Sequence, residues 1–288
     1  MELIKAEGMP NDFSLADLSD FHLGSPNCAE EKLEDAIRDI AADPRCYVIF
    51  KGDAIEAILP NDKRYLHSAV KDSLKSPKEQ ADRVIELMMP ISNRILAWGI
   101  GNHEMKLWNT MDFGKYIADS LGVPYGAYNF KVSYYGEDNK LMFKTYHTHG
   151  MGGLHSNAKD DIQYDANRKA GLKHKLNKSA HADCIYMSRG HDHQLLVVEP
   201  TVQNRLYLTD DGRGIHQHYY QQAHQNAKII PPDSRWYATT GSFRKLYSKP
   251  GLGHTDYGEV VGYAPSEIGY VMVTVKDRHI IDIDKKVC

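Results

Sequence analysis

Cysteine is scarce in this chain. Its four cysteines, Cys28, Cys46, Cys184 and Cys288, are spread over 288 residues, and none belongs to a CxxC pair. Zinc sites built on thiolates need such closely spaced pairs, and disulfide frameworks need many cysteines in a short chain. We therefore expect four thiols in a reducing compartment, no cysteine zinc site and a cytoplasmic protein.

Long apolar runs are also missing. The chain has no stretch of about 18 apolar residues, so we expect no transmembrane helix and no membrane partner. The segment from Met1 to Pro10 carries two acids and no apolar core, so we expect no signal peptide there. Internal repeats and low-complexity linkers are absent as well. We therefore expect one domain over residues 1–288, with residues 200–235 as a candidate hairpin or cap insertion.

Neither sign of charge is in large excess. The formal net charge is −3, which predicts no general affinity for nucleic acid or for an anionic membrane. One basic stretch stands out, Asn167 to Lys178, with five cations in twelve residues. It fits either a track for phosphate groups or the solvated face of an α-helix. The net charge leaves a locally positive site possible, because bound metal ions would be the largest charges there.

Short apolar runs alternate with helical patterns over the first half of the chain. Runs that end near glycine predict buried strands over Phe13 to Leu18, Tyr47 to Phe50, Ile95 to Trp98 and Cys184 to Met187. Glu30 to Ala41 has the apolar spacing of a helix, and Ser76 to Met89 begins with the residues of a capping box. Such alternation predicts an α/β architecture with crossover connections.

The rest of the sequence is richer in strand patterns. Phe130 to Tyr135 and Leu141 to His147 flank a turn and predict a hairpin. After Gly190 the pattern predicts a meander of short strands that ends near Ile283. The simplest assembly is two sheets packed face to face, with helices outside.

Metal-ligating side chains fall in five short blocks at predicted strand ends. They are Asp20-Phe21-His22, Gly52-Asp53, Gly101-Asn102-His103-Glu104, His149-Gly150 and Gly190-His191-Asp192-His193. Side chains just past the carboxyl ends of strands in an α/β sheet converge on one crevice, whatever their separation in sequence. A buried core has no use for so many Asp, Asn and His side chains, whereas a pair of divalent cations has.

The ligand types indicate which metals and which chemistry to expect. Carboxylate, amide and imidazole ligands without thiolate suit Mn, Fe, Zn or Mg, and the share of imidazole argues against Mg or Ca as the preferred ions. Two adjacent cations can bind a phosphoryl group and activate a water molecule. We therefore expect two divalent metal ions, with Mn favoured and Zn, Fe or Ni as alternatives, and metal-assisted hydrolysis of a phosphate ester.

In their order, the blocks D-x-H, G-D, G-N-H-E, H-G and G-H-x-H resemble the calcineurin-like metallophosphoesterase superfamily over residues 20 to 193. The resemblance implies a two-layer αββα sandwich of mixed sheets with helices outside and a dimetal site at the strand C-terminal ends. It implies a first metal on Asp20, His22 and His193 and a second on Asn102, His149 and His191. Asp53 would bridge them.

The resemblance also implies catalytic roles. His103 would stabilise the transferring phosphoryl group or protonate the leaving oxygen. Glu56, three residues after Asp53, would accept a hydrogen bond from His103, hold its ring and favour its cationic form.

Two departures from the pattern matter. Protein Ser/Thr phosphatases of this superfamily carry G-D-x-V-D-R-G, and this chain has Ala57 in place of the arginine, so we expect the phosphodiesterase or nuclease-like branch instead. The fourth block offers both His147 and His149, and we favour His149 because it adjoins the glycine.

We therefore expect an enzyme that hydrolyses phosphodiester bonds of nucleic acid or nucleotides by attack of a metal-bridging hydroxide. The alternatives are a phosphomonoesterase or nucleotide pyrophosphatase, and a catalytically silent metal-binding scaffold. The expected substrate-binding residues are Arg168, Lys173, Lys175 and Arg244.

Overall fold

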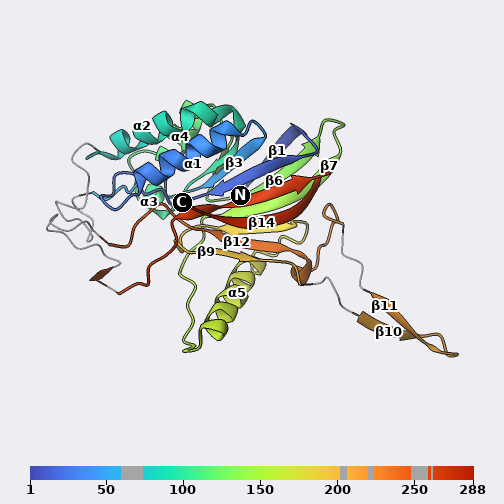
Figure 1. The fold of residues 1–288 in the computed structure, drawn as a ribbon. Helices are drawn as coiled ribbons and strands as arrows, with labels where there is room; N and C mark the ends of the chain where they lie inside the picture. The colour runs from blue at the N-terminus through green and yellow to red at the C-terminus, as the bar shows by residue number, and fades with distance from the viewer. Residues whose placement is uncertain (60–73, 202–205, 220–223, 248–258, 261) are drawn as a thin grey trace.

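Two six-stranded mixed sheets form the frame of the molecule in this computed structural model (Figure 1). The structure describes residues 1–59, 74–201, 206–219, 224–247, 259–260 and 262–288. The strands of the first sheet, sheet I, are in order β14 (His279–Val287), β13 (Gly269–Lys276), β2 (Phe13–Leu18), β3 (Cys46–Lys51), β4 (Ile95–Gly99) and β5 (Tyr125–Ala127). Those of sheet II are β1 (Glu2–Met9), β6 (Asn129–Gly136), β7 (Leu141–Thr148), β8 (Tyr186–Arg189), β12 (Trp236–Thr240) and β9 (Leu195–Val198).

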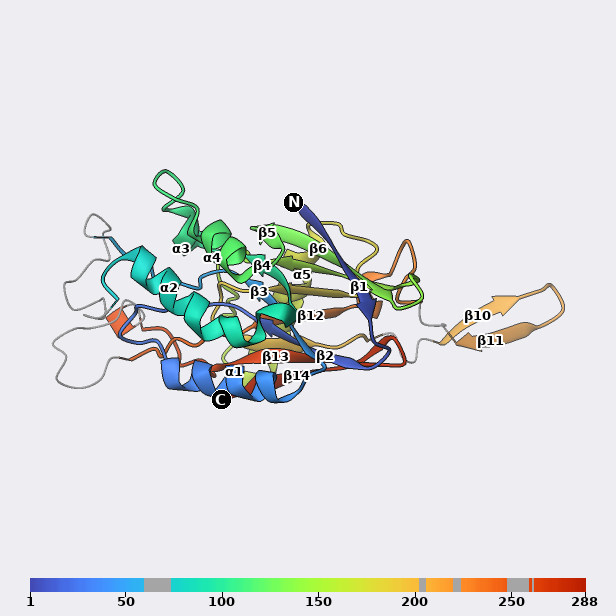
Figure 2. The same cartoon turned by 90° about the horizontal axis from the view of Figure 1, so that it is seen from above.

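Helices cover the outer face of each sheet. The helices over sheet I are α1 (Glu30–Ala42), α2 (Pro77–Met88) and α4 (Phe113–Leu121), and α5 (Asp161–Asn177) lies over sheet II (Figures 1 and 2). One apolar cluster joins sheet I to its helices, a second fills the space between the sheets, and a third joins α5 to sheet II. The predicted αββα sandwich is confirmed.

Local sequence signals located α1 and α2 well. α1 buries the predicted face of Leu33, Ala36, Ile37 and Ile40. At the start of α2, Ser76 and Glu79 form the predicted reciprocal capping box, and Pro77 occupies the first turn. The β6–β7 hairpin is also confirmed.

Two strand predictions need correction. The strand expected over Cys184 to Met187 lies two residues later as β8, because pairing with β7 begins only at Tyr186. The expected meander after Gly190 is wrong. β12 lies between β8 and β9, and β13 leaves for sheet I, where it pairs with β2. Strand pattern alone carries no information on pairing partners.

Several shorter elements complete the fold. They are α3 (Asn102–Met105), η2 (Met89–Arg94), η4 (Pro232–Ser234), and the paired strands β10 (Leu206–Asp210) and β11 (Ile215–Tyr219). The β10–β11 hairpin projects from the end of the sandwich opposite α3 (Figures 1 and 2). It lies within the predicted 200–235 insertion, and the division into one domain with that insertion stays a prediction.

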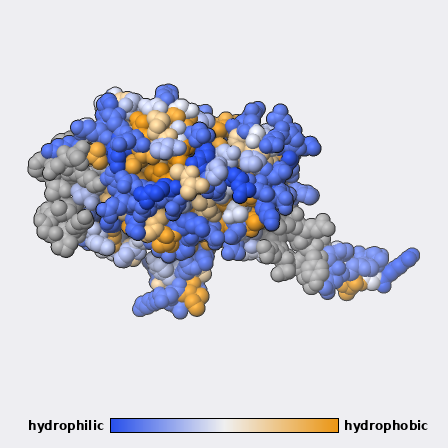
Figure 3. Space-filling view, turned by 45° about the horizontal axis from the view of Figure 1, so that its top comes forward, coloured by the Kyte–Doolittle hydropathy of each residue, from blue (hydrophilic) through white to orange (hydrophobic). Residues whose placement is uncertain are grey.

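Cys28, Cys46, Cys184 and Cys288 are free thiols in the structure. No helix in the described ranges is long and apolar enough to cross a membrane. Figure 3 shows a mainly hydrophilic face with scattered apolar groups.

Parallel pairing directs five strand ends to one edge of the sandwich. β2, β3 and β4 run parallel in sheet I, and β7 runs parallel to β8 in sheet II. Their C-terminal ends therefore lie on the same side of their sheets. The five sequence blocks follow these five ends.

Candidate metal centre

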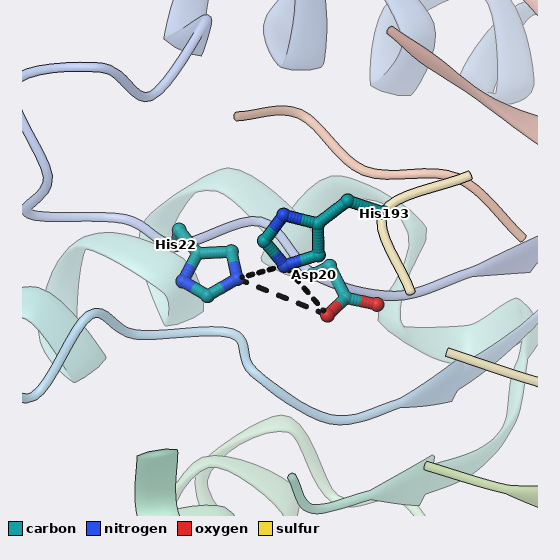
Figure 4. Close-up of side chains that lie close together, drawn as sticks. All are labelled: Asp20, His22 and His193. Atoms are coloured by element: carbon teal, nitrogen blue, oxygen red, sulfur yellow. Dashed lines mark hydrogen bonds and ion pairs between the residues drawn. The ribbon is translucent and has the colours of Figure 1, made fainter. Parts of the chain in front are cut away.

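The first cluster of ligand side chains joins the two sheets. Asp20 and His22 follow β2, and His193 comes from the loop after β8 (Figure 4). Nε2 of His22 and Nε2 of His193 are 2.9 Å apart. Oδ1 of Asp20 lies 3.4 Å from Nε2 of His193 and 3.8 Å from Nε2 of His22. Three donor atoms thus face one common point.

A second cluster lies beside the first. Oδ1 of Asn102, from α3, is 2.7 Å from Nδ1 of His191 and 3.0 Å from Nε2 of His149. Oδ2 of Asp53, from the loop after β3, is 3.2 Å from Nε2 of His149. Asp53, His149 and His191 form one of the three groups with metal-ligand spacing among the described residues.

Asp53 lies between the two clusters. The same Oδ2 atom that approaches His149 is 3.9 Å from Nε2 of His22 in the first cluster. Asp53 is 2% exposed, so its charge has little access to water. A carboxylate in this position can contact a cation on either side.

The arrangement fits a pair of metal ions. Donor atoms bound to one cation at about 2.1 Å stand about 3.0–3.4 Å from one another in octahedral or tetrahedral geometry. The separations of 2.7 to 3.8 Å between donors of one cluster bracket this range. The donors are carboxylate and amide oxygens and imidazole nitrogens, a set that suits Mn, Fe, Zn or Ni.

Five of the seven predicted ligands have left-handed backbone conformations. Their φ angles are 56° for Asp20, 50° for His22, 53° for Asp53, 71° for His191 and 54° for His193. This region is sparsely populated by residues other than glycine and marks functional sites when the surroundings enforce it. The conformation turns each side chain inward immediately after its strand ends.

Glu104 ties two of the loops together. Its buried carboxylate accepts backbone N–H groups of Asp53 at 3.1 Å, Ala54 at 2.6 Å and Gly101 at 2.9 Å. Gly101 is needed for this close approach, because a Cβ there would lie 2.0 Å from Oδ1 of Asp53. Nothing in the Gly101-Asn102-His103-Glu104 block predicts this role of Glu104.

The ligand histidines differ in their protonation. Burial alone would lower the pKa of His22, but the nearby carboxylates, Glu56 foremost, raise it to about 10. Burial is likewise outweighed by Asp53 at His149, whose pKa rises to about 9. Burial lowers the pKa of His193. One of the two facing Nε2 atoms can donate its proton to the other.

Glu56 and His103 lie at the site, but not as the sequence predicted. Oε2 of Glu56 is 2.7 Å from Nδ1 of His22, whereas Nδ1 of His103 donates to the backbone carbonyl of Glu56 at 2.5 Å. The cationic form of His103 is not favoured in this structure. Burial lowers its pKa to about 4, against the opposing pull of Asp53 and Glu56. Its Nε2 lies 4.0 Å from Oδ2 of Asp53.

The two histidines of the fourth block have different surroundings. His149 follows the end of β7 and contacts the second cluster, and its Nδ1 is 3.1 Å from the backbone carbonyl of Lys51. His147 lies within β7 and contacts Ser188 at 2.8 Å and Thr145 at 2.7 Å in the space between the sheets. The geometry therefore favours His149 as the ligand.

A cavity of about 370 Å³ opens over the clusters. It is lined by His22, Asp53, Asn102, His103, His191, His193 and Arg244, and also by His155, Tyr164, Lys245 and Tyr263. Of the four predicted substrate-binding residues, only Arg244 lines it. No sequence motif marks His155, Tyr164 or Tyr263 as part of the lining.

The other three predicted substrate contacts are engaged elsewhere. Arg168 donates to Oε1 of Gln194 at 2.6 Å, and Gln194 lines the cavity. Lys173 pairs with Asp233 at 2.8 Å. Lys175 donates to the backbone carbonyl of Gly152 at 2.7 Å and so supports the loop after β7. The helical interpretation of the basic stretch is confirmed, since α5 contains most of it.

Comparisons with known proteins give remote structural likenesses. The calcineurin-like phosphoesterase YfkN from Bacillus subtilis has a TM-score of 0.35 and 10% identity, over 96% of this chain and 90% of that one. Haemophilus influenzae NAD nucleotidase (NadN) has a TM-score of 0.38 and 12% identity, over 96% of this chain and 50% of that one. No protein-family model and no curated protein sequence matches the chain. The likenesses are too remote to assign a function, which rests on the residues of the site.

Proposed function

We propose that this protein is a dimetal phosphoesterase, related to the calcineurin-like superfamily, that hydrolyses phosphodiester bonds of nucleic acid or nucleotides. One observation carries the proposal: Oδ2 of Asp53 lies 3.9 Å from His22 and 3.2 Å from His149, between two ligand clusters. A carboxylate shared in this way can hold two cations close enough to act on one phosphoryl group. The order of the five sequence blocks supports the same class of enzyme.

The clusters would supply metal chemistry to a bound ester. Two divalent cations held by Asp20, His22 and His193 and by Asn102, His149 and His191, with Asp53 between them, would neutralise phosphoryl oxygens and lower the pKa of the attacking water. These seven residues are the proposed metal ligands. The protein's own contribution is to hold these donors rigidly at the ends of packed strands.

His103 has a separate part in this proposal. Its Nδ1 is committed to the carbonyl of Glu56, which leaves Nε2 on the cavity side. The negative charge of a bound phosphate favours the protonated ring. Nε2 would then donate to the leaving oxygen as it separates from phosphorus.

The shape and charge of the cavity support a diester. Arg244 and Lys245 on its wall have the charge opposite to a phosphate. Leu154 and Tyr164 line one part of it, and Tyr263 comes from a distant part of the sequence. The volume of about 370 Å³ lies in the range of small-molecule pockets and is large enough for an ester with two substituents.

Hydrolysis of bis-p-nitrophenyl phosphate tests the proposal. We expect turnover with Mn²⁺ in the wild type and its loss in Asp53→Asn and His103→Gln, with His216→Gln on the exposed hairpin as the control. A wild type with no turnover in Mn, Zn, Fe, Co or Ni would support the silent scaffold instead. Hydrolysis of p-nitrophenyl phosphate alone would support the monoesterase alternative.

A panel of natural substrates then identifies the ester. Single- and double-stranded DNA, RNA, cyclic nucleotides and dinucleotides, each with the best cation, separate a nuclease from a nucleotide phosphodiesterase. Failure of every diester in the panel would contradict the proposed substrate class.

A further inference from the structure

A series of buried polar side chains leads from Asp20 into the space between the two sheets. We call Asp17, Ser19, Lys51, Tyr186 and Thr240 the inter-sheet network, and none is more than 1% exposed. Polar groups buried among apolar side chains are unfavourable unless each finds a partner. These five find partners in one another.

The anchor of the network is a buried ion pair. The ammonium of Lys51 donates to Oδ1 of Asp17, and the hydroxyl of Tyr186 donates to Oδ2 of Asp17 at 2.7 Å. Lys51 also lies 3.2 Å from Oγ1 of Thr240. Both oxygens of the Asp17 carboxylate are therefore occupied, and the ammonium is held against Thr240.

Only one direction of hydrogen bonding suits the rest of the network. An ammonium can only donate and a carboxylate can only accept. Thr240 therefore accepts from Lys51, and Ser19 donates to Oδ2 of Asp20 at 2.5 Å. Ser19 has a single proton, so its 2.7 Å contact with Thr240 must be donated by Thr240. The backbone carbonyl of Arg189, at 3.3 Å from Thr240, is the longer alternative acceptor.

The network acts on one oxygen of Asp20 and not on the other. Oδ2 accepts from Ser19 at 2.5 Å and from the backbone N–H of His191 at 3.0 Å, and the same N–H lies 3.3 Å from Oδ1. Oδ1 is the oxygen that lies 3.4 Å from His193 and 3.8 Å from His22. Oδ2 is thus held by the shorter hydrogen bonds, and Oδ1 faces the first cluster.

We propose that Thr240 and Ser19, anchored by Lys51 and Asp17, are positioning residues that hold Asp20 so that Oδ1 alone faces the first cation. This inference rests on the proposed dimetal function. Ser19 follows β2 in sheet I and Thr240 ends β12 in sheet II, so the same bonds fix the two sheets that supply the first cluster. Partners of this kind set ligand orientation and metal affinity.

The neighbouring threonine provides a matched control. Thr239 and Thr240 are both fully buried, but successive strand residues point to opposite faces. Thr239 lies on the α5 side with Tyr237, whereas Thr240 points between the sheets with Ala238. Oγ1 of Thr239 has no hydrogen-bond partner within the described part of the chain. Thr239→Val and Thr240→Val are therefore the same chemical change, but only Thr240→Val removes a member of the inter-sheet network.

The test is the binding of Mn²⁺ to the metal-free full chain, measured by titration calorimetry and by electron paramagnetic resonance. We expect Thr240→Val to weaken one of two sites by roughly 10–100-fold, as loss of such a partner does. With one equivalent of Mn²⁺ added, the resonance spectrum of Thr240→Val should show isolated Mn²⁺ ions and no exchange-coupled pair. Thr239→Val should bind as the wild type does, and Thr240→Ser should restore the pair.

Ser19→Ala provides a second, independent break in the network should Thr240→Val fold poorly. Two wild-type sites in both Thr240→Val and Ser19→Ala would overturn the positioning role and leave the proposed function standing. A wild type that binds no pair of Mn²⁺ ions would overturn both.

Discussion

Oε2 of Glu56 lies 2.7 Å from Nδ1 of His22 and so determines which nitrogen of that ring faces the first cluster. A carboxylate on one ring nitrogen fixes the tautomer, orients the ring and makes the other nitrogen a better metal ligand. The contact places Glu56 behind the proposed metal ligand His22, in contrast to its predicted place behind His103.

This relationship predicts the effect of Glu56→Gln. The amide keeps the shape but loses the charge, so cation affinity should fall roughly 10–100-fold. Calorimetric titration with Mn²⁺ measures it. Glu86→Gln is the control, because Glu86 is 70% exposed in a surface pair with Arg83. If Glu56→Gln instead kept wild-type affinity and lost only turnover, the earlier assignment to His103 would be right.

Protonation of His22 and His149 predicts an unusual pH dependence. Their pKa values in the folded chain are raised from 6.5 to about 10 and about 9. A raised pKa adds stability that is complete below the unfolded value and lost as pH rises through the folded value. The melting temperature of the metal-free protein should therefore fall as the pH rises from about 6.5 to about 9.

Saturating Mn²⁺ should reverse that trend, since cation binding displaces the protons and strengthens as pH rises. Scanning calorimetry with and without Mn²⁺ measures both slopes. A melting temperature that is flat or rises in the metal-free protein over this window would contradict the expectation.

Local signals explain what the sequence predicted well. The capping box at Ser76 and the apolar face of α1 depend on residues within one or two helical turns, and both are present. The ligand blocks were identifiable because parallel strands bring their ends together regardless of spacing.

Features that depend on contacts between distant segments could not be predicted from the sequence. Ser19 and Thr240 are 221 positions apart, and nothing in either segment marks the other as its partner. The choice of Glu56 between His22 and His103 depends on how one loop turns after β3. The sequence favoured His149 over His147 because His149 adjoins Gly150, and β7 does end at Thr148, just before His149.

Breaking the buried Asp17–Lys51 ion pair should lower the free energy of unfolding much more than breaking an exposed pair. Lys51→Met leaves a buried carboxylate without its cation, which should cost about 3–5 kcal/mol in the free energy of unfolding. Lys115→Met removes an exposed pair with Asp119 and should cost about 0–1 kcal/mol. Urea unfolding at pH 7 compares them. Equal effects would show that Asp17 finds another partner or takes up a proton.

Gly101→Ala tests the close approach of two loops. The added Cβ would lie 2.0 Å from Oδ1 and 2.5 Å from the backbone nitrogen of Asp53, so the carboxylate must move away from its position between the clusters. We expect loss of paired Mn²⁺ binding. Gly171→Ala in α5 is the control, because its nearest neighbour is a Leu154 methyl group at 3.7 Å. Retained paired binding in Gly101→Ala would mean that the loops can separate without disturbing Asp53.

Arg244 and Lys173 separate a cavity contact from a surface pair. Arg244 lines the cavity, and Arg244→Gln should raise KM for a diester about tenfold, the effect of losing roughly 1.4 kcal/mol of binding, with a smaller change in kcat. Lys173 is paired with Asp233 outside the cavity lining, so Lys173→Gln should leave KM unchanged. Steady-state kinetics with bis-p-nitrophenyl phosphate at two salt concentrations measures both. If Lys173→Gln raised KM as much as Arg244→Gln, and the effect vanished at high salt, the basic face of α5 would be part of the substrate path after all.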